Sequence, residues 1–174
     1  MQLANQHPAA FIYADFAEAS AAAEDSKPVF GVRISGLNFL IPANRVCELL
    51  DKTQVNALPN VHPWISGIVN LRGQLVPVFD LQAALKINND IKKRRLLAID
   101  KEEKAIAIWI DNFPEIKDLL TMTPAKNLPT LPDVLETWVI GGYEDDNQLW
   151  LEIKFEDLFK TLGRHHYAAE QVAI

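Results

Sequence analysis

Apolar and polar residues alternate in several short runs of the chain, which is the pattern of half-buried β-strands. After Pro28, the side chains of Phe30, Val32 and Ile34 fall on one face, "SGLN" supplies a turn, and "FLIP" returns to Pro42. The same alternation recurs in "RLLAID" and "AIAIWID", joined by the turn "KEEK", and in "WVIGGYE" and "LWLEIK", joined by "DDNQ". The pattern therefore predicts a chain built mainly of short hairpins.

Residues 67–81, "GIVNLRGQLVPVFDL", form another predicted hairpin with an arginine and a glycine at its turn. Gly73 can adopt a left-handed turn conformation without steric cost, so the chain reverses there and places Arg72 at an exposed tip. Pro77 cannot donate a ladder hydrogen bond, which favours a position at an edge or a bulge.

The other segments carry weaker signals. "NRVCELLD" at 44–51 fits helix or strand, and we favour a strand. We expect one helical turn in "PNVHPWIS", about two in "LQAALKI", and a helix in "FEDLFKTL" at 155–162. The proline-rich stretch after residue 111 is predicted to be a long, partly helical connection.

Both chain ends are predicted to lie outside the folded domain. In residues 1–26, Ile12, Phe16, Ala19 and Ala23 are spaced to line one side of a helix. The segment is therefore either a short docking helix or a frayed tail. Residues 163–174 are expected to form a C-terminal tail.

Identical residues recur at a distance of 74 positions. The pairs are Trp64 and Trp138, Gly67 and Gly141, Gln74 and Gln148, and Leu75 and Leu149. Each copy also runs strand, turn, strand and short helix, so we expect two similar lobes of short strands, each closing on itself into a small barrel.

Composition and charge narrow the class of protein. The chain has 174 residues, 49% of them hydrophobic, and a formal net charge of -6. That charge has the wrong sign for a protein that binds nucleic acid or anionic lipid. A single cysteine, Cys47, excludes internal disulfides, and no run of about 18 apolar residues occurs that would insert into a membrane. We expect a soluble cytoplasmic protein.

No motif for catalysis, metal binding or a cofactor is present. The chain lacks the nucleophile-elbow, dinucleotide, Walker and zinc-protease motifs, and its acidic pairs fall at predicted turns. The adjacent His165 and His166 are poorly spaced for a metal. We expect "KKRR" at 92–95 to be a solvated linker, and Trp109 and Trp150 to pack in the core.

Arg72 is the candidate binding residue. Its guanidinium offers a fixed fork of donors to a carboxylate or a carbonyl oxygen. The simpler alternative is that Arg72 braces its own hairpin or pairs with Asp80, as most surface arginines have no specific partner.

The stretch "GIVNLRGQLVPVFDL" resembles the signature of the CheW family of chemotaxis adaptors, in which Asn-Leu-Arg-Gly, Val-Pro and Asp-Leu occur in this order and spacing. "FGVRISGLNFLIPANRVCELL", "AIAIWIDNF" and "LWLEIKFEDLF" resemble other parts of the family. The resemblance covers about residues 28–162.

The resemblance implies a mainly β fold with short helices, in which two five-stranded SH3-like barrels pack together. It implies a non-catalytic adaptor that couples the cytoplasmic tips of chemoreceptors to the regulatory domain of a CheA-type histidine kinase, at membrane-associated receptor arrays. Carried over by position, the receptor-facing residues are Asn70, Arg72, Gly73, Val46 and Glu48. Barrel-edge strands would pair with the kinase.

Some positions depart from the family pattern. Gln82 replaces a usual arginine, "IDNFPEI" changes the usual spacing, and the segment before residue 27 is long. These departures resemble the pilus-type (PilI-like) branch, which serves twitching motility through type IV pili. Two other classes stay open: a free-standing SH3-like protein-binding module in an unrelated complex, and an enzyme with an unrecognised site.

Overall fold

The computed structural model describes residues 26–88 and 93–168, with side chains up to residue 163. The fold is mainly β, as predicted. Its strands are β1 Pro28–Ile34, β2 Leu37–Pro42, β3 Cys47–Leu50, β4 Ile65–Leu71, β5 Gln74–Phe79, β6 Arg95–Ile99, β7 Ile106–Ile110, β8 Glu115–Asp118, β9 Thr123–Pro124, β10 Val139–Asp145 and β11 Gln148–Ile153. The helices are α2 Leu81–Ala84, the 3-10 turn η1 Glu102–Lys104, α3 Asp133–Glu136 and α4 Phe155–Ala168.

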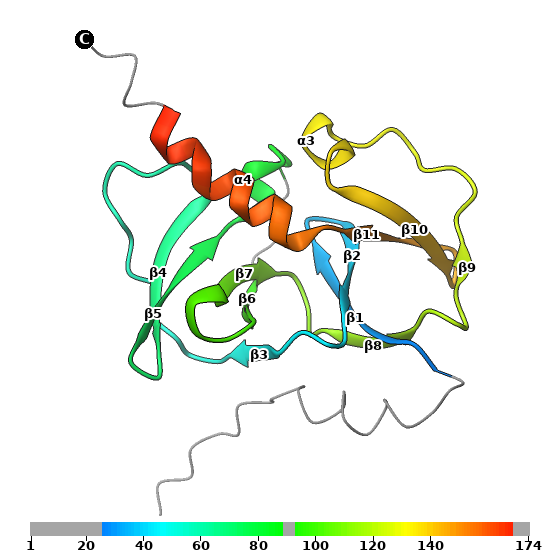
Figure 1. The fold of residues 1–174 in the computed structure, drawn as a ribbon, viewed down its shortest axis with the longest axis horizontal. Coiled ribbons are helices and arrows are strands. Elements are labelled where there is room, and N and C mark those ends of the chain that lie inside the picture. The colour runs from blue at the N-terminus through cyan, green and yellow to red at the C-terminus, as the bar shows by residue number, and fades with distance from the viewer. Residues whose placement is uncertain (1–25, 89–92, 169–174) are drawn as a thin grey trace, which may run out of the picture.

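The strands form two sheets, one in each of two lobes that lie side by side (Figure 1). The five-stranded lobe has the order β3-β6-β7-β5-β4, and the six-stranded lobe has the order β8-β1-β2-β11-β10-β9. The prediction of five strands in each lobe was wrong for the second, because the stretch predicted to be partly helical also contains β8 and β9. The two ladder orders are open, so backbone pairing alone does not close either sheet into a barrel.

The hairpins reverse where the sequence predicts turns. Ser35 and Gly36, Arg72 and Gly73, and Asp146 and Asn147 all have positive φ angles. Two consecutive residues with positive φ give a turn whose twist matches that of the flanking strands. These tight turns therefore set the register of each hairpin, and the left-handed conformation of Arg72 has a steric cost that a glycine would avoid.

The 74-residue repeat is confirmed in the backbone. Both β4 and β10 have a register shift at equivalent places, between Ile65 and Gly67 and between Val139 and Gly141. Each hairpin continues through a parallel pairing, of β5 with β7 and of β11 with β2. Helices α2 and α4 begin 74 residues apart. The two copies also share a backbone hydrogen bond. The amide of Asp80 donates to the carbonyl of Trp64 at 2.7 Å, and the amide of Lys154 donates to the carbonyl of Trp138 at 2.9 Å.

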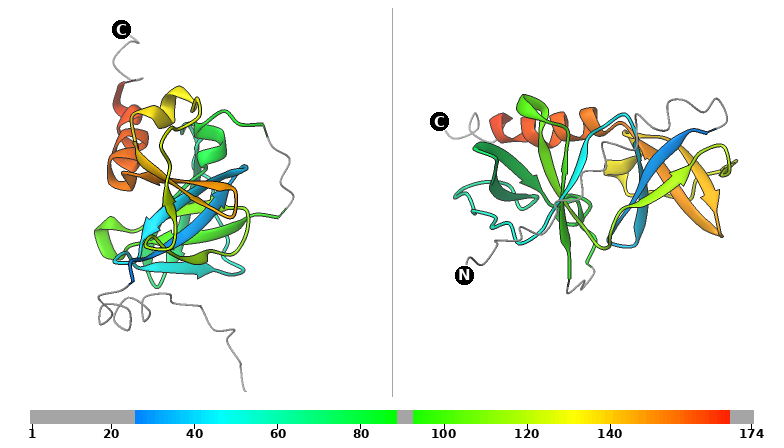
Figure 2. Two further views of the ribbon diagram at one scale, coloured as in Figure 1. Left: turned by 90° about the vertical axis from the view of Figure 1, so that its right-hand side faces the viewer. Right: turned by 90° about the horizontal axis from the view of Figure 1, so that it is seen from below.

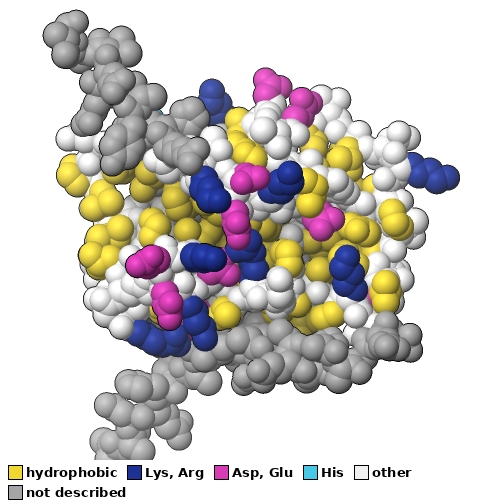
Figure 3. All heavy atoms as spheres, in the orientation of Figure 1, with side chains coloured by type: hydrophobic (Ala, Val, Ile, Leu, Met, Phe, Trp, Pro, Cys, Tyr) yellow, Lys and Arg dark blue, Asp and Glu magenta, His cyan; other side chains and the backbone are white. Residues whose placement is uncertain are grey.

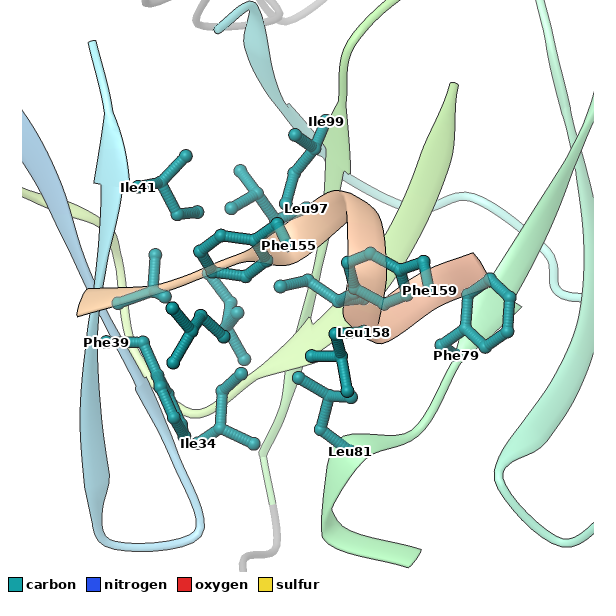
Figure 4. Packing of buried hydrophobic residues seen from close by; sticks show 14 of the residues in the cluster. Ile34, Phe39, Ile41, Phe79, Leu81, Leu97, Ile99, Phe155, Leu158 and Phe159 are labelled. Carbon is teal, nitrogen blue, oxygen red and sulfur yellow. The ribbon is translucent and has the colours of Figure 1, made fainter. Parts of the chain in front are cut away.

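Three apolar clusters form the core of the described structure, and one of them joins the two lobes. One lies inside the five-stranded lobe around Val76 and Ala107, and one lies inside the six-stranded lobe around Trp150. The third and largest lies between the lobes and includes Phe155 and Leu158 of α4. Figure 4 shows these α4 side chains packed among residues of both sheets. Helix α4 therefore fixes one lobe against the other.

The lobes also meet through the backbone at the end of β7. The amide of Asp111 donates to the carbonyl of Arg33 in β1 at 2.8 Å. The right-hand view of Figure 2, from below, shows the two sheets lying side by side. Together with the packing of α4, this contact holds the two lobes against each other.

Several local predictions were confirmed or corrected. Residues 44–51 contain a strand, as favoured, and Trp150 is fully buried. Residues 59–64 contain turns instead of a helical turn and lead directly into β4, and α2 is one turn long instead of two. Strand β5 is not an edge strand. Its pairing with β7 covers only Val78 and Phe79. No backbone hydrogen bond to β7 is therefore needed from Pro77, which has no amide hydrogen to donate.

The ends of the chain differ from the expectation on one side. Helix α4 continues past the predicted end at residue 162 to Ala168. The predicted docking helix or tail at the N-terminus falls almost wholly outside the described residues, as do residues 169–174.

Candidate partner-binding site

The tip of the β4–β5 hairpin carries three of the five predicted binding residues. Arg72 and Gly73 form the turn with φ angles of 52° and 87°. The side-chain oxygen of Asn70 accepts a hydrogen bond from the amide of Gly73 at 2.8 Å. Asn70 thus stabilises the turn that presents Arg72, and a longer or apolar side chain at position 70 would lose this bond.

The guanidinium of Arg72 is held by a carboxylate from the far edge of the same sheet. Its Nη2 lies 2.7 Å from Oε1 of Glu48 in β3. The Glu48 side chain is only 10% exposed, whereas that of Arg72 is 59% exposed. Because β3 and β4 are the two ends of the sheet order, this ion pair joins the sheet's edges and presents an oriented cation to solvent.

The alternative partner proposed for Arg72 was wrong. Asp80 instead pairs with Arg94 at 2.8 Å and accepts a hydrogen bond from the amide of Ala83 at the start of α2. Asp80 is therefore an N-cap, and a carboxylate at that position stabilises the first turn of a helix.

Val46, the fifth predicted residue, is attached to a different part of the lobe. It is half-buried just before β3, and its carbonyl accepts a hydrogen bond from the amide of Asp100 at 2.8 Å. The structure thus brings Glu48 to the hairpin tip, while Val46 fixes the end of β6.

An apolar surface leads away from the tip along β5. Leu75 is 64% exposed, and Pro77 and Phe79 follow it on the same face of the strand. Pro77 and Phe79 line an open groove of about 410 Å³, whose far wall is formed by Phe155 and Phe159 of α4. Figure 3 shows hydrophobic side chains gathered over β4 and β5 beside α4.

Charged side chains form the rim of this groove. Arg45 bridges Asp100 and, at 2.9 Å, Glu156 of α4. Burial lowers the pKa of the Arg45 guanidinium, but Glu156 and Asp100 outweigh it, so the pKa is raised above its ordinary value. The hydrogen bond from Arg45 lowers the pKa of Glu156. The groove therefore has an apolar floor and a fixed polar rim, which suits a partner's helix better than a small charged molecule.

A related arrangement in the six-stranded lobe was missed by sequence reasoning. Glu48 lies opposite Ala98 in the ladder of β3 with β6, and Glu115 lies opposite Gly31 in the ladder of β8 with β1. The two glutamates occupy equivalent places in the 74-residue repeat. The strand pairings lead from equivalent residues of β5 and β11 to Glu48 in one sheet and to Glu115 in the other. Glu115 also holds a cation, with Arg33 at 2.7 Å. Because β8 was not predicted, no sequence signal pointed to Glu115.

Among residues 26–88 and 93–168, no group of three or more histidine, cysteine, aspartate or glutamate side chains is placed to hold a metal ion. Across the same residues, no helix combines the length and apolarity needed to cross a membrane.

Comparison with known proteins places this geometry in a family. The family model "CheW-like domain" matches residues 28–162. Protein PilI of Pseudomonas aeruginosa is 28% identical over 123 residues, which are 70% of this chain and 68% of that protein. A probable chemotaxis protein CheW of Rhizobium etli is 24% identical over 141 residues, 78% of this chain and 89% of that protein.

A solved structure has the same fold. The scaffolding protein TtCheW of Thermoanaerobacter tengcongensis superposes with a TM-score of 0.62 at 21% identity, over 78% of this chain and 93% of that one. The family match covers well over half of the chain and includes both lobes and the hairpin tip. The chain is therefore a member of the family of CheW-like domains, whose fold it shares.

Proposed function

We propose that this protein is a non-catalytic adaptor that couples chemoreceptor cytoplasmic tips to a CheA-type histidine kinase in the cytoplasm, at membrane-associated receptor arrays. The observation that carries the proposal is the hairpin tip, where an exposed guanidinium is oriented by a buried carboxylate. Membership of the CheW-like family supports the same role.

The receptor-facing surface in this proposal begins at the hairpin tip. Arg72, Glu48, Asn70 and Gly73 define the tip, and Val46 lies at the entry to the same lobe. A receptor's helical hairpin would lie along the exposed apolar face of β5 into the groove beside α4, while Arg72 fixes its register by charge. The kinase's regulatory domain, which has the same fold in this family, would pair with edge strands of the lobes.

The likeness to PilI supports assignment to a pilus-type pathway. In this proposal the adaptor serves twitching motility through type IV pili, and not flagellar rotation. Deleting the gene would abolish twitching and leave swimming intact. Loss of swimming with normal twitching would contradict the assignment to pili.

Arg72→Glu tests the receptor-facing role. The change reverses the exposed charge and places two carboxylates together, so we expect co-sedimentation with receptor-containing membranes to fall at least tenfold. Lys126→Glu is the matched control, because it makes the same charge change at an exposed site in the other lobe. The amide NMR spectrum shows whether each variant is folded.

Unchanged co-sedimentation of a folded Arg72→Glu protein would overturn the role of the tip. A free-standing binding module would instead be indicated if affinity capture from the source cell recovers neither a chemoreceptor nor a CheA-type kinase. That outcome would overturn the adaptor proposal as a whole.

A further inference from the structure

A second groove lies at the junction of the lobes, away from the hairpin tip. It is open, has a volume of about 840 Å³, and is lined by Arg33 of β1, residues 93–95 at the start of β6, and residues 111–115 after β7. The proposed adaptor role makes no use of it.

The groove has an excess of available positive charge. Of its two carboxylates, Glu115 already holds Arg33 and Lys117, whereas the Oδ1 atom of Asp111 is buried without a hydrogen-bond partner and burial raises the pKa of that carboxyl. Lys93 and Arg95, in contrast, have no carboxylate within ion-pair distance among the described residues. These two cations are therefore available to an acidic ligand.

Large apolar side chains are exposed in the groove and along the segment that follows it in the chain. Phe113 is 55% exposed, with the Arg95 guanidinium 3.6 Å from its ring centroid, and Ile116 of β8 is 51% exposed. Leu120 is exposed four residues further on. A strip of exposed hydrophobic side chains next to cations favours a ligand that is both apolar and acidic.

Such a segment of this chain emerges at the end of the strip. The amide of Lys27 donates to Oδ1 of Asp118 at 2.8 Å, and the amide of Leu119 donates to the carbonyl of Lys27 at 3.0 Å. The residues before Lys27 include four carboxylates and no lysine or arginine. They therefore complement the groove in charge, and they start at the end of the strip that is farther from Phe113.

The lengths also agree. Phe113 and Asp118 are five positions apart, which corresponds to about 17 Å of extended chain at roughly 3.3 Å per residue. Ile12 and Ala23, the first and last members of the apolar spacing in the N-terminal segment, are eleven residues apart. Eleven residues span about 17 Å at 1.5 Å per residue if they are helical.

We infer that residues 12–25 bind in cis to this groove, as a tethered acidic ligand. Ile12 and Phe16 contact Phe113 and Ile116, and the carboxylates of the segment pair with Lys93 and Arg95. Tethering raises the local concentration of the segment to about the millimolar range, so a weak contact is enough to populate the bound state. The bound segment covers one face of the lobe junction and competes there with any acidic partner.

A spin label on the segment tests the inference in the full-length chain. Ala19→Cys supplies the attachment point, while Cys47 is fully buried and its thiol pKa is raised to about 12, so it does not react under native conditions. We expect the amide NMR signals of Phe113 and Ile116 to lose more than half their intensity relative to the reduced label. Signals at the hairpin tip should be unaffected.

Charge reversal provides the matched comparison. In Lys93→Glu/Arg95→Glu the lost intensity should return, whereas Lys86→Glu/Lys126→Glu, which makes the same charge change at two exposed sites elsewhere, should leave the broadening unchanged. If the double variant does not fold, Lys93→Glu alone replaces it, because Lys93 is at an exposed position. Partial recovery in that variant supports the inference.

Three results would overturn the inference. One is uniform or absent broadening at Phe113 and Ile116, and another is broadening that ignores the charge reversal. The third comes from mixing two samples, one spin-labelled without isotope and the other isotope-labelled without spin label. Broadening that appears only in this mixture would assign the groove to a second copy of the chain.

Discussion

At the scale of single residues, the site depends on a few positions where backbone and side chain are both constrained. The Arg72 guanidinium is oriented because Gly73 and Asn70 fix the turn and because Glu48, at the opposite edge of the sheet, accepts its hydrogen bond. The tip was predictable from sequence because a turn is local. Its partner was not, because Glu48 lies 24 residues away and meets Arg72 only through the curvature of the sheet.

The two glycines of this hairpin differ in what they tolerate. Gly67 has φ of 138°, and an added Cβ would lie 2.1 Å from the carbonyl oxygen of Asn56. Gly73 has φ of 87° but open space around it. We expect Gly67→Ala to lower the free energy of unfolding by about 3 kcal/mol or more, and Gly73→Ala by about 1 kcal/mol.

Urea denaturation of both variants measures this difference. Equal losses at the two positions would contradict the close approach of Asn56 to the β4 bulge.

The buried thiol of Cys47 makes stability depend on alkaline pH. Burial, and then the charge of Asp100, raises its pKa from 9.0 to about 12. The native state therefore retains a proton that the unfolded chain releases, so the contribution is fully present below pH 9 and is lost as the pH rises towards 12. Unfolding free energies measured between pH 8 and pH 11 should fall more steeply for the wild type than for Cys47→Ala.

The comparison with Cys47→Ala removes the contributions of lysines and tyrosines, which titrate in both proteins. Parallel pH profiles would show that the thiol ionises in the native state as easily as in the unfolded chain.

At the scale of elements, the hairpins followed from the sequence and the irregular parts did not. Alternation with a two-residue turn is a strong local signal, so the paired strands were found. Strands β8 and β9 are short and lie among prolines, and their existence depends on β1 and β10 as partners. Helix α4 was predicted to end before Gly163, a residue typical of helix ends, but it continues through it.

Helix α4 is the element whose packing matters most for the shared core. Leu158 is 1% exposed within the cluster between the lobes, so Leu158→Ala should cost about 3 kcal/mol of unfolding free energy. Lys160→Ala, at an exposed position on the same helix, should change it by less than about 0.5 kcal/mol. Thermal and urea denaturation both measure these values.

A cost below about 1 kcal/mol for Leu158→Ala would indicate that α4 is only loosely attached. In that case the helix could not hold the two lobes in a fixed relation.

At the scale of the whole molecule, one rigid body presents separate surfaces. The lobes share a core and a backbone junction, while the hairpin tip, the groove beside α4 and the sheet edges lie at different places on it. An adaptor needs this combination, because displacement at one surface must reach the other without being absorbed by internal motion. The sequence predicted the two lobes through the 74-residue repeat, but not the apolar cluster around α4 that joins them.

The most direct measurement is a three-component co-sedimentation with the kinase and the receptor encoded in the same genome. Membranes containing the receptor, the CheA-type kinase and this protein are mixed, and the kinase in the pellet is quantified. The adaptor account predicts that the kinase sediments at least fivefold more with the wild-type protein than without it, and that Arg72→Glu removes this gain. Equal amounts of pelleted kinase with and without the wild-type protein would contradict the account.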